Sequence, residues 1–177
     1  MSALEAKFLQ LSWKLHPDNF VNASETEREL SLKRSSELND AYRTLRDPVA
    51  RVEYLLAIEG ARKEGEQKQQ APPELLEEVF ELNESLDEMR EAKSAGDDLA
   101  ALRVRLSAAE KTFQAKLAEV DTELVQAAER WDAAVDAESA GAQNRSERDA
   151  IKKQLNELLN RRSYIRNLVI NVQKELV

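Results

Sequence analysis

The sequence predicts an all-α protein in two helical parts. Charged residues make up 34 % of the 177 residues and aromatic residues only 5 %, which is typical of helical bundles with long solvated faces. Apolar residues recur at spacings of three and four along most of the chain, and no segment alternates as a half-buried strand does. Four glycines and four prolines leave long stretches uninterrupted.

The composition also excludes several classes of function. The chain has no cysteine and one histidine, which excludes disulfides, a thiolate nucleophile and cysteine-ligated metal centres, so we expect no metal and no cofactor. A net charge of −8 argues against nucleic-acid binding. No apolar run approaches the roughly 20 residues of a membrane span. We therefore expect a cytoplasmic protein that binds neither membranes nor nucleic acids.

The first helix is predicted by one apolar face and ended by a proline. Its four apolar positions share that face because they are spaced by four, three and four residues: Leu4, Phe8, Leu11 and Leu15. Pro17 ends the helix, since proline disfavours helical geometry in the residue before it. Residues 16–23 are then expected to form a loop.

Two further helices complete the first part. Ser24 and Glu27 form a capping box that starts the second helix. Its apolar positions are Leu30, Leu38, Ala41, Tyr42 and Leu45. Asp47 and Pro48 start a short third helix, with Val52, Leu55, Leu56 and Tyr54 facing inward, and Gly60 ends it.

A polar linker is predicted at residues 61–73, so residues 1–60 and 74–177 are expected to be separate domains. The second domain has three long apolar seams at heptad-like spacing. The first contains Leu75, Val79, Leu82, Leu86 and Met89, and ends near Gly96. The second follows a cap at Asp97 and runs from Leu99 to Val135, with Trp131 in the seam. The third starts at Ser146 and runs from Ile151 to Leu176. Such helices joined by short turns predict an antiparallel three-helix bundle.

The loop after the first helix carries the most informative residues, His16, Pro17 and Asp18, preceded by Lys14. Proline restricts the backbone, so an imidazole and a carboxylate would be displayed with little entropy left to lose on binding. That favours recognition over acid–base catalysis, which needs a pocket and an orienting group. The alternative is a surface histidine at a helix C-terminus, where positive charge is favourable.

These residues resemble the signature of J-domains. The segment from Asn39 to Leu56, with its Tyr-Leu-Leu ending, is similar to the end of an HscB-type J-domain, and Leu75–Met89 is similar to the HscB C-terminal module. The resemblance covers nearly the whole chain. J-domains of this family carry a short helix before the residues corresponding to Leu4, and we expect that helix to be absent here, either because the domain is reduced or because the start is truncated. Without it, we expect a weakly stable J-domain.

The resemblance implies a co-chaperone with two protein partners and no enzymatic activity of its own. Through the J-domain, HscB-type proteins bind a DnaK/HscA-type chaperone and stimulate its ATPase. Through the bundle they bind an IscU-type iron–sulfur scaffold protein. By position, the chaperone-binding residues are Lys14, His16, Pro17 and Asp18. The scaffold-binding residues are Leu76, Phe80, Glu81, Glu84 and Tyr164.

The residues alone also make the scaffold-binding face unusual. Leu76 and Phe80 lie beside the first seam of the bundle, not within it, so they predict an exposed apolar patch. The alternative is a broad apolar face that widens the core. Two other functions remain open at this point. One is a coiled-coil adaptor whose degenerate J-domain activates no chaperone, and the other is an enzyme with His16 as general base.

Overall fold

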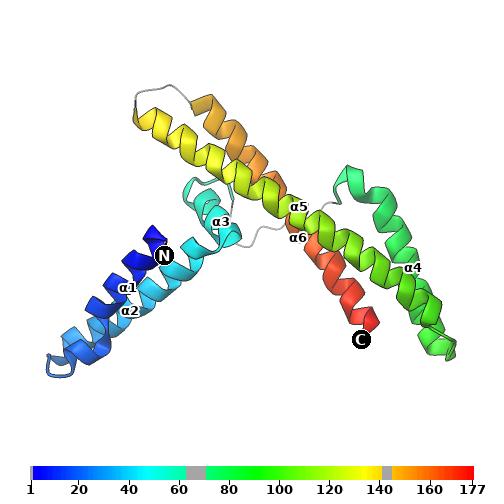
Figure 1. Cartoon of the computed structure of the whole chain (residues 1–177), viewed down its shortest axis with the longest axis horizontal. Helices are drawn as coiled ribbons and strands as arrows, with labels where there is room; N and C mark the ends of the chain where they lie inside the picture. The colour runs from blue at the N-terminus through cyan, green and yellow to red at the C-terminus, as the bar shows by residue number, and fades with distance from the viewer. Residues whose placement is uncertain (1, 63–70, 141–144) are drawn as a thin grey trace. The chain divides into compact units, whose positions relative to one another are not determined.

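The computed structural model describes residues 2–62, 71–140 and 145–177, and every regular element in these ranges is helical (Figure 1). This confirms the all-α class. Contacts divide the chain into two compact units, Met1–Leu55 and Leu56–Val177, hereafter the N-terminal unit and the bundle unit. The division falls within the third helix, earlier than the expected boundary at residue 60. Most of the expected linker at 61–73 lies outside the described residues, so those domain limits stay predictions.

The N-terminal unit is built on a hairpin of α1 (Ala3–Leu15) and α2 (Glu25–Arg46), joined through the short 3-10 helix η1 (Pro17–Phe20). The predicted capping box is present, because Ser24 and Glu27 each accept a hydrogen bond from the other's backbone N–H. Between the helices, the rings of Phe8 and Tyr42 stack with centroids 4.0 Å apart. The predicted helical hairpin is therefore confirmed.

Tyr54 of the third helix was expected to face inward, and this was wrong, because the side chain is exposed. Leu30 and Leu45, two of the apolar positions named on the second helix, are exposed as well. α1 contains no fully buried residue, and α2 contains only Ser31. A helix packed along one neighbour buries one stripe of its surface, and its other apolar positions stay in water.

The third helix, α3 (Pro48–Ile58), has the predicted ends. Asp47 Oδ1 accepts a hydrogen bond from the N–H of Ala50 at 2.8 Å, as an N-cap does. After the helix, Gly60 adopts a φ of 65°, a left-handed conformation that favours glycine. Val52 and Leu56 are buried, as expected.

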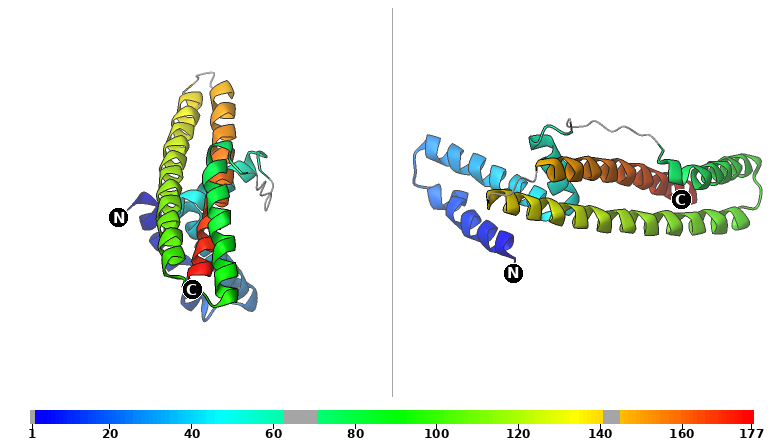
Figure 2. Two further views of the ribbon diagram at one scale, coloured as in Figure 1. Left: turned by 90° about the vertical axis from the view of Figure 1, so that its right-hand side faces the viewer. Right: turned by 90° about the horizontal axis from the view of Figure 1, so that it is seen from above.

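The bundle unit contains η2 (Pro73–Leu75), α4 (Leu76–Ala95), α5 (Ala100–Ser139) and α6 (Arg145–Leu176) (Figure 2). Ion pairs fix the helix directions. Along α4 and α5, Glu78 pairs with Lys116 and Glu88 with Arg105, so these helices are antiparallel. The same holds for α5 and α6, which are joined by the ion pair of Asp121 with Arg162 and by the hydrogen bond from Arg130 to Gln154. The predicted antiparallel bundle is confirmed.

The predicted seams form the core of the bundle. Buried residues include Leu75, Val79, Leu82, Leu86 and Met89 of the first seam, Leu106, Phe113, Val120, Leu124, Ala127 and Trp131 of the second, and Ile151, Leu155, Leu158, Ile165, Leu168 and Val172 of the third. The prediction that Asp97 caps the second of these helices was wrong. α5 begins at Ala100 with Leu99 at the N-cap position, and Asp98 Oδ1 accepts from the N–H of Ala100.

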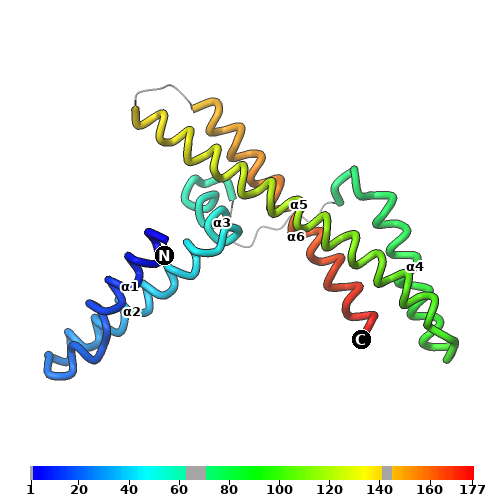
Figure 3. Tube along the Cα trace, viewed as in Figure 1, coloured from blue at the N-terminus to red at the C-terminus, as the bar shows by residue number. Residues whose placement is uncertain are grey.

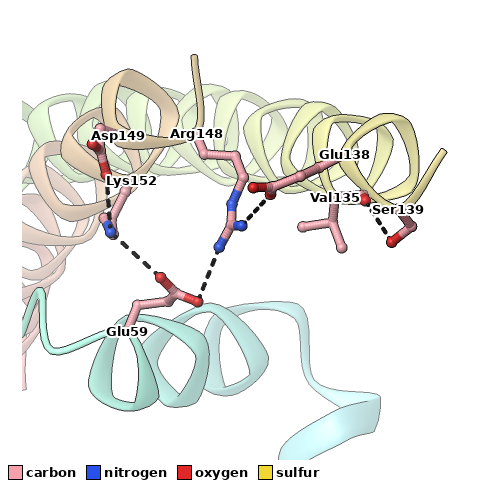
Figure 4. Close-up of polar contacts among 7 residues, drawn as sticks. All are labelled: Glu59, Val135, Glu138, Ser139, Arg148, Asp149 and Lys152. Atoms are coloured by element: carbon pink, nitrogen blue, oxygen red, sulfur yellow. Dashed lines mark hydrogen bonds and ion pairs between the residues drawn. The ribbon is translucent and has the colours of Figure 1, made fainter. Parts of the chain in front are cut away.

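A short segment, Leu56–Arg62, completes the end of the bundle that α4 does not reach. The trace of α5 continues well past α4 (Figure 3). There, Glu59 lies 3.3 Å from a terminal nitrogen of Arg148 and 3.4 Å from Lys152 Nζ (Figure 4). The guanidinium of Arg148 stacks over the buried ring of Trp131, 4.8 Å from its centroid. Trp131 is therefore a core residue, as its place in the seam predicts.

Candidate partner-binding sites

The loop that carries His16, Pro17 and Asp18 begins where α1 breaks. His16 has an extended ψ of 131°, and the chain then makes a single 3-10 turn. Proline lacks the N–H that would continue the helix and restricts its neighbour, so the break follows from the sequence. The imidazole and the carboxylate are consequently presented beyond the end of α1.

The two functional side chains of this loop are linked to one another. The N–H of Asp18 donates to His16 Nδ1 at 3.3 Å. A carboxylate oxygen of Asp18 lies 3.5 Å from the same nitrogen. The side chains are 53 % and 85 % exposed. General acid–base catalysis works in pockets that exclude water. This geometry suits capture by another protein.

The surface that precedes the loop is a mixture of charged and apolar groups. Lys14 lies exposed in the last turn of α1, next to Trp13, which is 78 % exposed. Leu9, one turn earlier, is also exposed. Trp13 lies off the face formed by Leu4, Phe8, Leu11 and Leu15, in agreement with its exposure. Lys14 is therefore available beside the loop, but on a helix poor in cations.

On the bundle, α4 exposes two large apolar side chains. Leu76 is 55 % exposed and Phe80 is 71 % exposed, while their neighbours Leu75 and Val79 are buried. The alternative that these residues widen the core is therefore wrong. Glu84 continues the same stripe one turn further along the helix. We refer to Leu76, Phe80 and Glu84 as the α4 stripe.

Tyr164 of α6 is half-buried. Two contacts join α6 to α4 and to the residues just before α4: Arg161 Nε lies 3.5 Å from Glu74 Oε1, and Arg90 Nε donates to Glu175 Oε1 at 2.8 Å. Tyr164 follows Arg161 by about one turn, so it lies on the part of α6 whose level along the bundle is close to the start of α4.

The predicted acidic contacts lie toward one edge of α4. Glu81 and Glu84 line a groove of about 340 Å³ between α4 and α5. The groove is flanked by the Glu78–Lys116 and Glu88–Arg105 pairs. Glu81 and Glu84 therefore lie on the side of α4 that faces α5.

Two side chains near the loop were not found from the sequence. Ser31 is 3 % exposed and donates to the carbonyl of Leu15 at 2.9 Å. Asn19 Nδ2 donates to the carbonyl of Trp13 at 2.6 Å. Ser31 lies in a serine- and charge-rich stretch, and only the packing of α2 on α1 distinguishes it from its neighbours. Neither residue has a signal in the sequence alone.

Neither a metal-ligating cluster nor a membrane-spanning helix is found among the described residues. Across residues 2–62, 71–140 and 145–177, no three histidine, cysteine, aspartate or glutamate side chains cluster as a metal site would. Of the helices described in these ranges, none combines the length and apolar character needed to cross a membrane.

Comparison with known proteins gives one consistent result. Residues 71–137 match the family model described as HSCB C-terminal oligomerisation domain. A co-chaperone protein HscB homolog of Vibrio vulnificus is 38 % identical over 135 residues, 76 % of each chain. Its counterpart in Vibrio parahaemolyticus is 37 % identical over 70 % of each chain. The structure of chaperone HscB from Vibrio cholerae superposes with a TM-score of 0.61 at 26 % identity, covering 98 % of this chain and 89 % of that one. This chain belongs to the HscB co-chaperone family.

Proposed function

We propose that this chain is a co-chaperone of iron–sulfur cluster assembly that connects two proteins in the cytoplasm. Its His16–Asp18 loop stimulates the ATPase of a DnaK/HscA-type chaperone. Its bundle binds an IscU-type scaffold protein. Membership of the HscB family supports the general role, and the loop and the α4 stripe supply the two surfaces that this role needs.

The proposed stimulation of the chaperone rests on one observation: His16 and Asp18 lie beside a proline on an exposed loop. Both side chains are accessible, and their mutual contact leaves few alternative arrangements. A preorganised loop loses less entropy on docking than a mobile one. Lys14 adds a positive charge next to the loop and suits an acidic partner surface.

The proposed binding of the scaffold protein depends on the exposed α4 stripe and the acidic residues beside it. A phenylalanine that is 71 % exposed beside an exposed leucine is costly on a free surface, and such patches commonly mark protein interfaces. Tyr164 on α6 and Glu81 on α4 would extend the contact. Large apolar anchors surrounded by polar residues are the usual arrangement of binding hot spots.

Such a protein acts by shifting populations of its partners' states, not by chemistry of its own. The loop would favour the hydrolysing state of the chaperone, while the bundle keeps the scaffold nearby. Neither step requires a nucleophile or a cofactor from this chain.

The test is the steady-state ATPase rate of the chaperone with and without this protein. We expect wild-type protein to stimulate the rate and His16→Gln to lose that stimulation, because glutamine is polar and of similar length but has no imidazole. Glu53→Gln, an exposed change on α3, is the control and should stimulate like wild type.

The adaptor is the second candidate, favoured by the thin packing of the α1–α2 hairpin. Scaffold binding by wild-type protein together with an unchanged ATPase rate would establish the adaptor instead.

A further inference from the structure

The break in α1 leaves backbone carbonyls without their helical donors. In an unbroken helix, the carbonyl of Trp13 would accept from the N–H of residue 17, but Pro17 has none. The carbonyl of Leu15 would accept from the N–H of Asn19. That N–H donates instead to the carbonyl of His16 at 3.0 Å. The Trp13 carbonyl still accepts from the N–H of His16, but only at 3.5 Å, so each of the two carbonyls can take a further donor.

Two side chains take the place of the missing donors. Asn19 Nδ2 reaches the carbonyl of Trp13 at 2.6 Å and folds the loop back onto the last turn of α1. Ser31 Oγ reaches the carbonyl of Leu15 at 2.9 Å from the neighbouring helix α2. Leu15 directly precedes His16, so the second bond fixes the peptide from which the functional loop departs.

Ser31 differs from Asn19 in one decisive respect. It is 3 % exposed, the only polar residue so deeply buried within the parts of the chain that the structure describes. A partner that docks on the loop cannot touch it. A buried carbonyl that loses its donor is costly, so the chain is expected to move when the hydroxyl is removed. Any effect of Ser31 on the loop must therefore be transmitted through Leu15.

We propose that Ser31 is a positioning residue for the His16–Asp18 loop, with Asn19 holding the other end of the same turn. This inference rests on the proposed function of the loop and adds what sets its geometry. α2 does more than pack against α1, since it supplies the donor that fixes where the loop begins. The hydrogen bond between Asp18 N–H and His16 Nδ1 depends on that starting point.

The test compares Ser31→Ala with Ser36→Ala in the full chain. Ser36 is an exposed serine of the same helix, so the pair has equal chemistry and differs in burial. Alanine favours helix more than serine does, so α2 should persist in both. The first readout is by NMR: the ¹⁵N chemical shifts of the His16 ring and the chemical shift of the Asp18 backbone amide. The second is stimulation of the chaperone's ATPase at subsaturating protein.

We expect Ser31→Ala to move the His16 and Asp18 signals and to lower stimulation about threefold to tenfold, from the strength of one buried hydrogen bond. Ser36→Ala should change neither. Ser31→Thr keeps the hydroxyl and should restore the signals and part of the stimulation. A role confined to holding α1 against α2 would change amide exchange along both helices and leave the His16 ring signals in place.

Unchanged loop signals in Ser31→Ala would overturn the inference, as would moved signals with full stimulation. If wild-type protein stimulates no chaperone, the proposed function fails instead. The His16 and Asp18 signals then decide the positioning role alone, with movement supporting it and no movement overturning it. Asn19→Asp removes the other donor and gives an independent variant, and its loop signals should move as well.

Discussion

At the scale of single residues, the exposure of Phe80 is the feature that a folding argument alone does not explain. The core of the bundle is complete without it, because Val79 and Leu82 already fill the inward face of that turn. A large ring in water contributes little to the free energy of unfolding. Its place on the α4 stripe makes sense as a contact for another protein.

Phe80→Ala is therefore expected to weaken scaffold binding while the bundle stays stable. Truncation of an aromatic hot spot costs about 1–3 kcal/mol of binding free energy, roughly tenfold or more in Kd. Calorimetric titration with the scaffold protein measures it. Val104→Ala is the matched control, since Val104 is 72 % exposed on α5. Equal affinity of wild type and Phe80→Ala would show that the contact lies elsewhere.

At the scale of elements, one ion pair joins the C-terminal end of α6 to α4. Arg90 donates to Glu175, and this hydrogen bond lowers the pKa of Glu175 below its ordinary 4.5, against the opposing effect of burial. Lys93 Nζ also lies 3.5 Å from the carboxylate. A folded-state pKa below the unfolded one means that the native chain binds this proton more weakly. The stabilisation is therefore complete above about pH 4.5 and is lost as the pH falls through the lowered pKa.

Glu175→Gln should accordingly lower the stability of the bundle at about pH 7 and make little difference at about pH 3. Urea unfolding of both proteins at the two pH values measures the difference. Glu119→Gln, an exposed change on α5, serves as the control. A destabilisation of the same size at both pH values would mean that packing of the side chain, not its charge, holds the end of α6.

The elements also show how far the sequence could predict the fold. Period and capping signals gave the helices and their ends to within a residue or two, because they depend on local rules. Burial on α3 was overestimated at Tyr54, since the amount of a helix that neighbours cover is a tertiary property. The cation–π contact of Arg148 with Trp131 joins residues of two helices and has no local signal.

The candidate sites divide in the same way. The break that displays His16, Pro17 and Asp18 could be predicted from proline, whereas their selection as chaperone-binding residues came from the resemblance to J-domains. The α4 stripe could be selected because Leu76 and Phe80 fall outside the heptad seam. Ser31 could not, because its importance comes from a carbonyl on another helix.

At the scale of the whole molecule, the two units differ in how much apolar surface they bury. α1 has no fully buried side chain and α2 has one serine, whereas α4, α5 and α6 each bury several large apolar residues. Burial contributes about 25 cal/mol for each Å² of apolar surface. The N-terminal unit should therefore open more readily than the bundle unit.

Amide hydrogen exchange measures this difference directly. We expect residues 4–56 to exchange about tenfold faster or more than the core of the bundle, because opening costs less free energy where fewer apolar contacts are lost. Exchange at two pH values serves as the control that opening is at equilibrium. Protection of residues 4–56 equal to that of α5 would contradict the expected weakness of this unit.

The central claim is that one chain carries two surfaces which act together, and the scaffold-dependent ATPase rate of the chaperone tests it most directly. We expect wild-type protein to stimulate the ATPase most strongly when the scaffold protein is present. His16→Gln should not stimulate it, whether the scaffold protein is present or absent. Phe80→Ala should lose only the part of the stimulation that depends on the scaffold protein. A mixture of the two variants should not recover the wild-type rate, because each surface must be on the same molecule as the other. Full recovery by the mixture, or an unchanged rate with wild-type protein, would contradict the account.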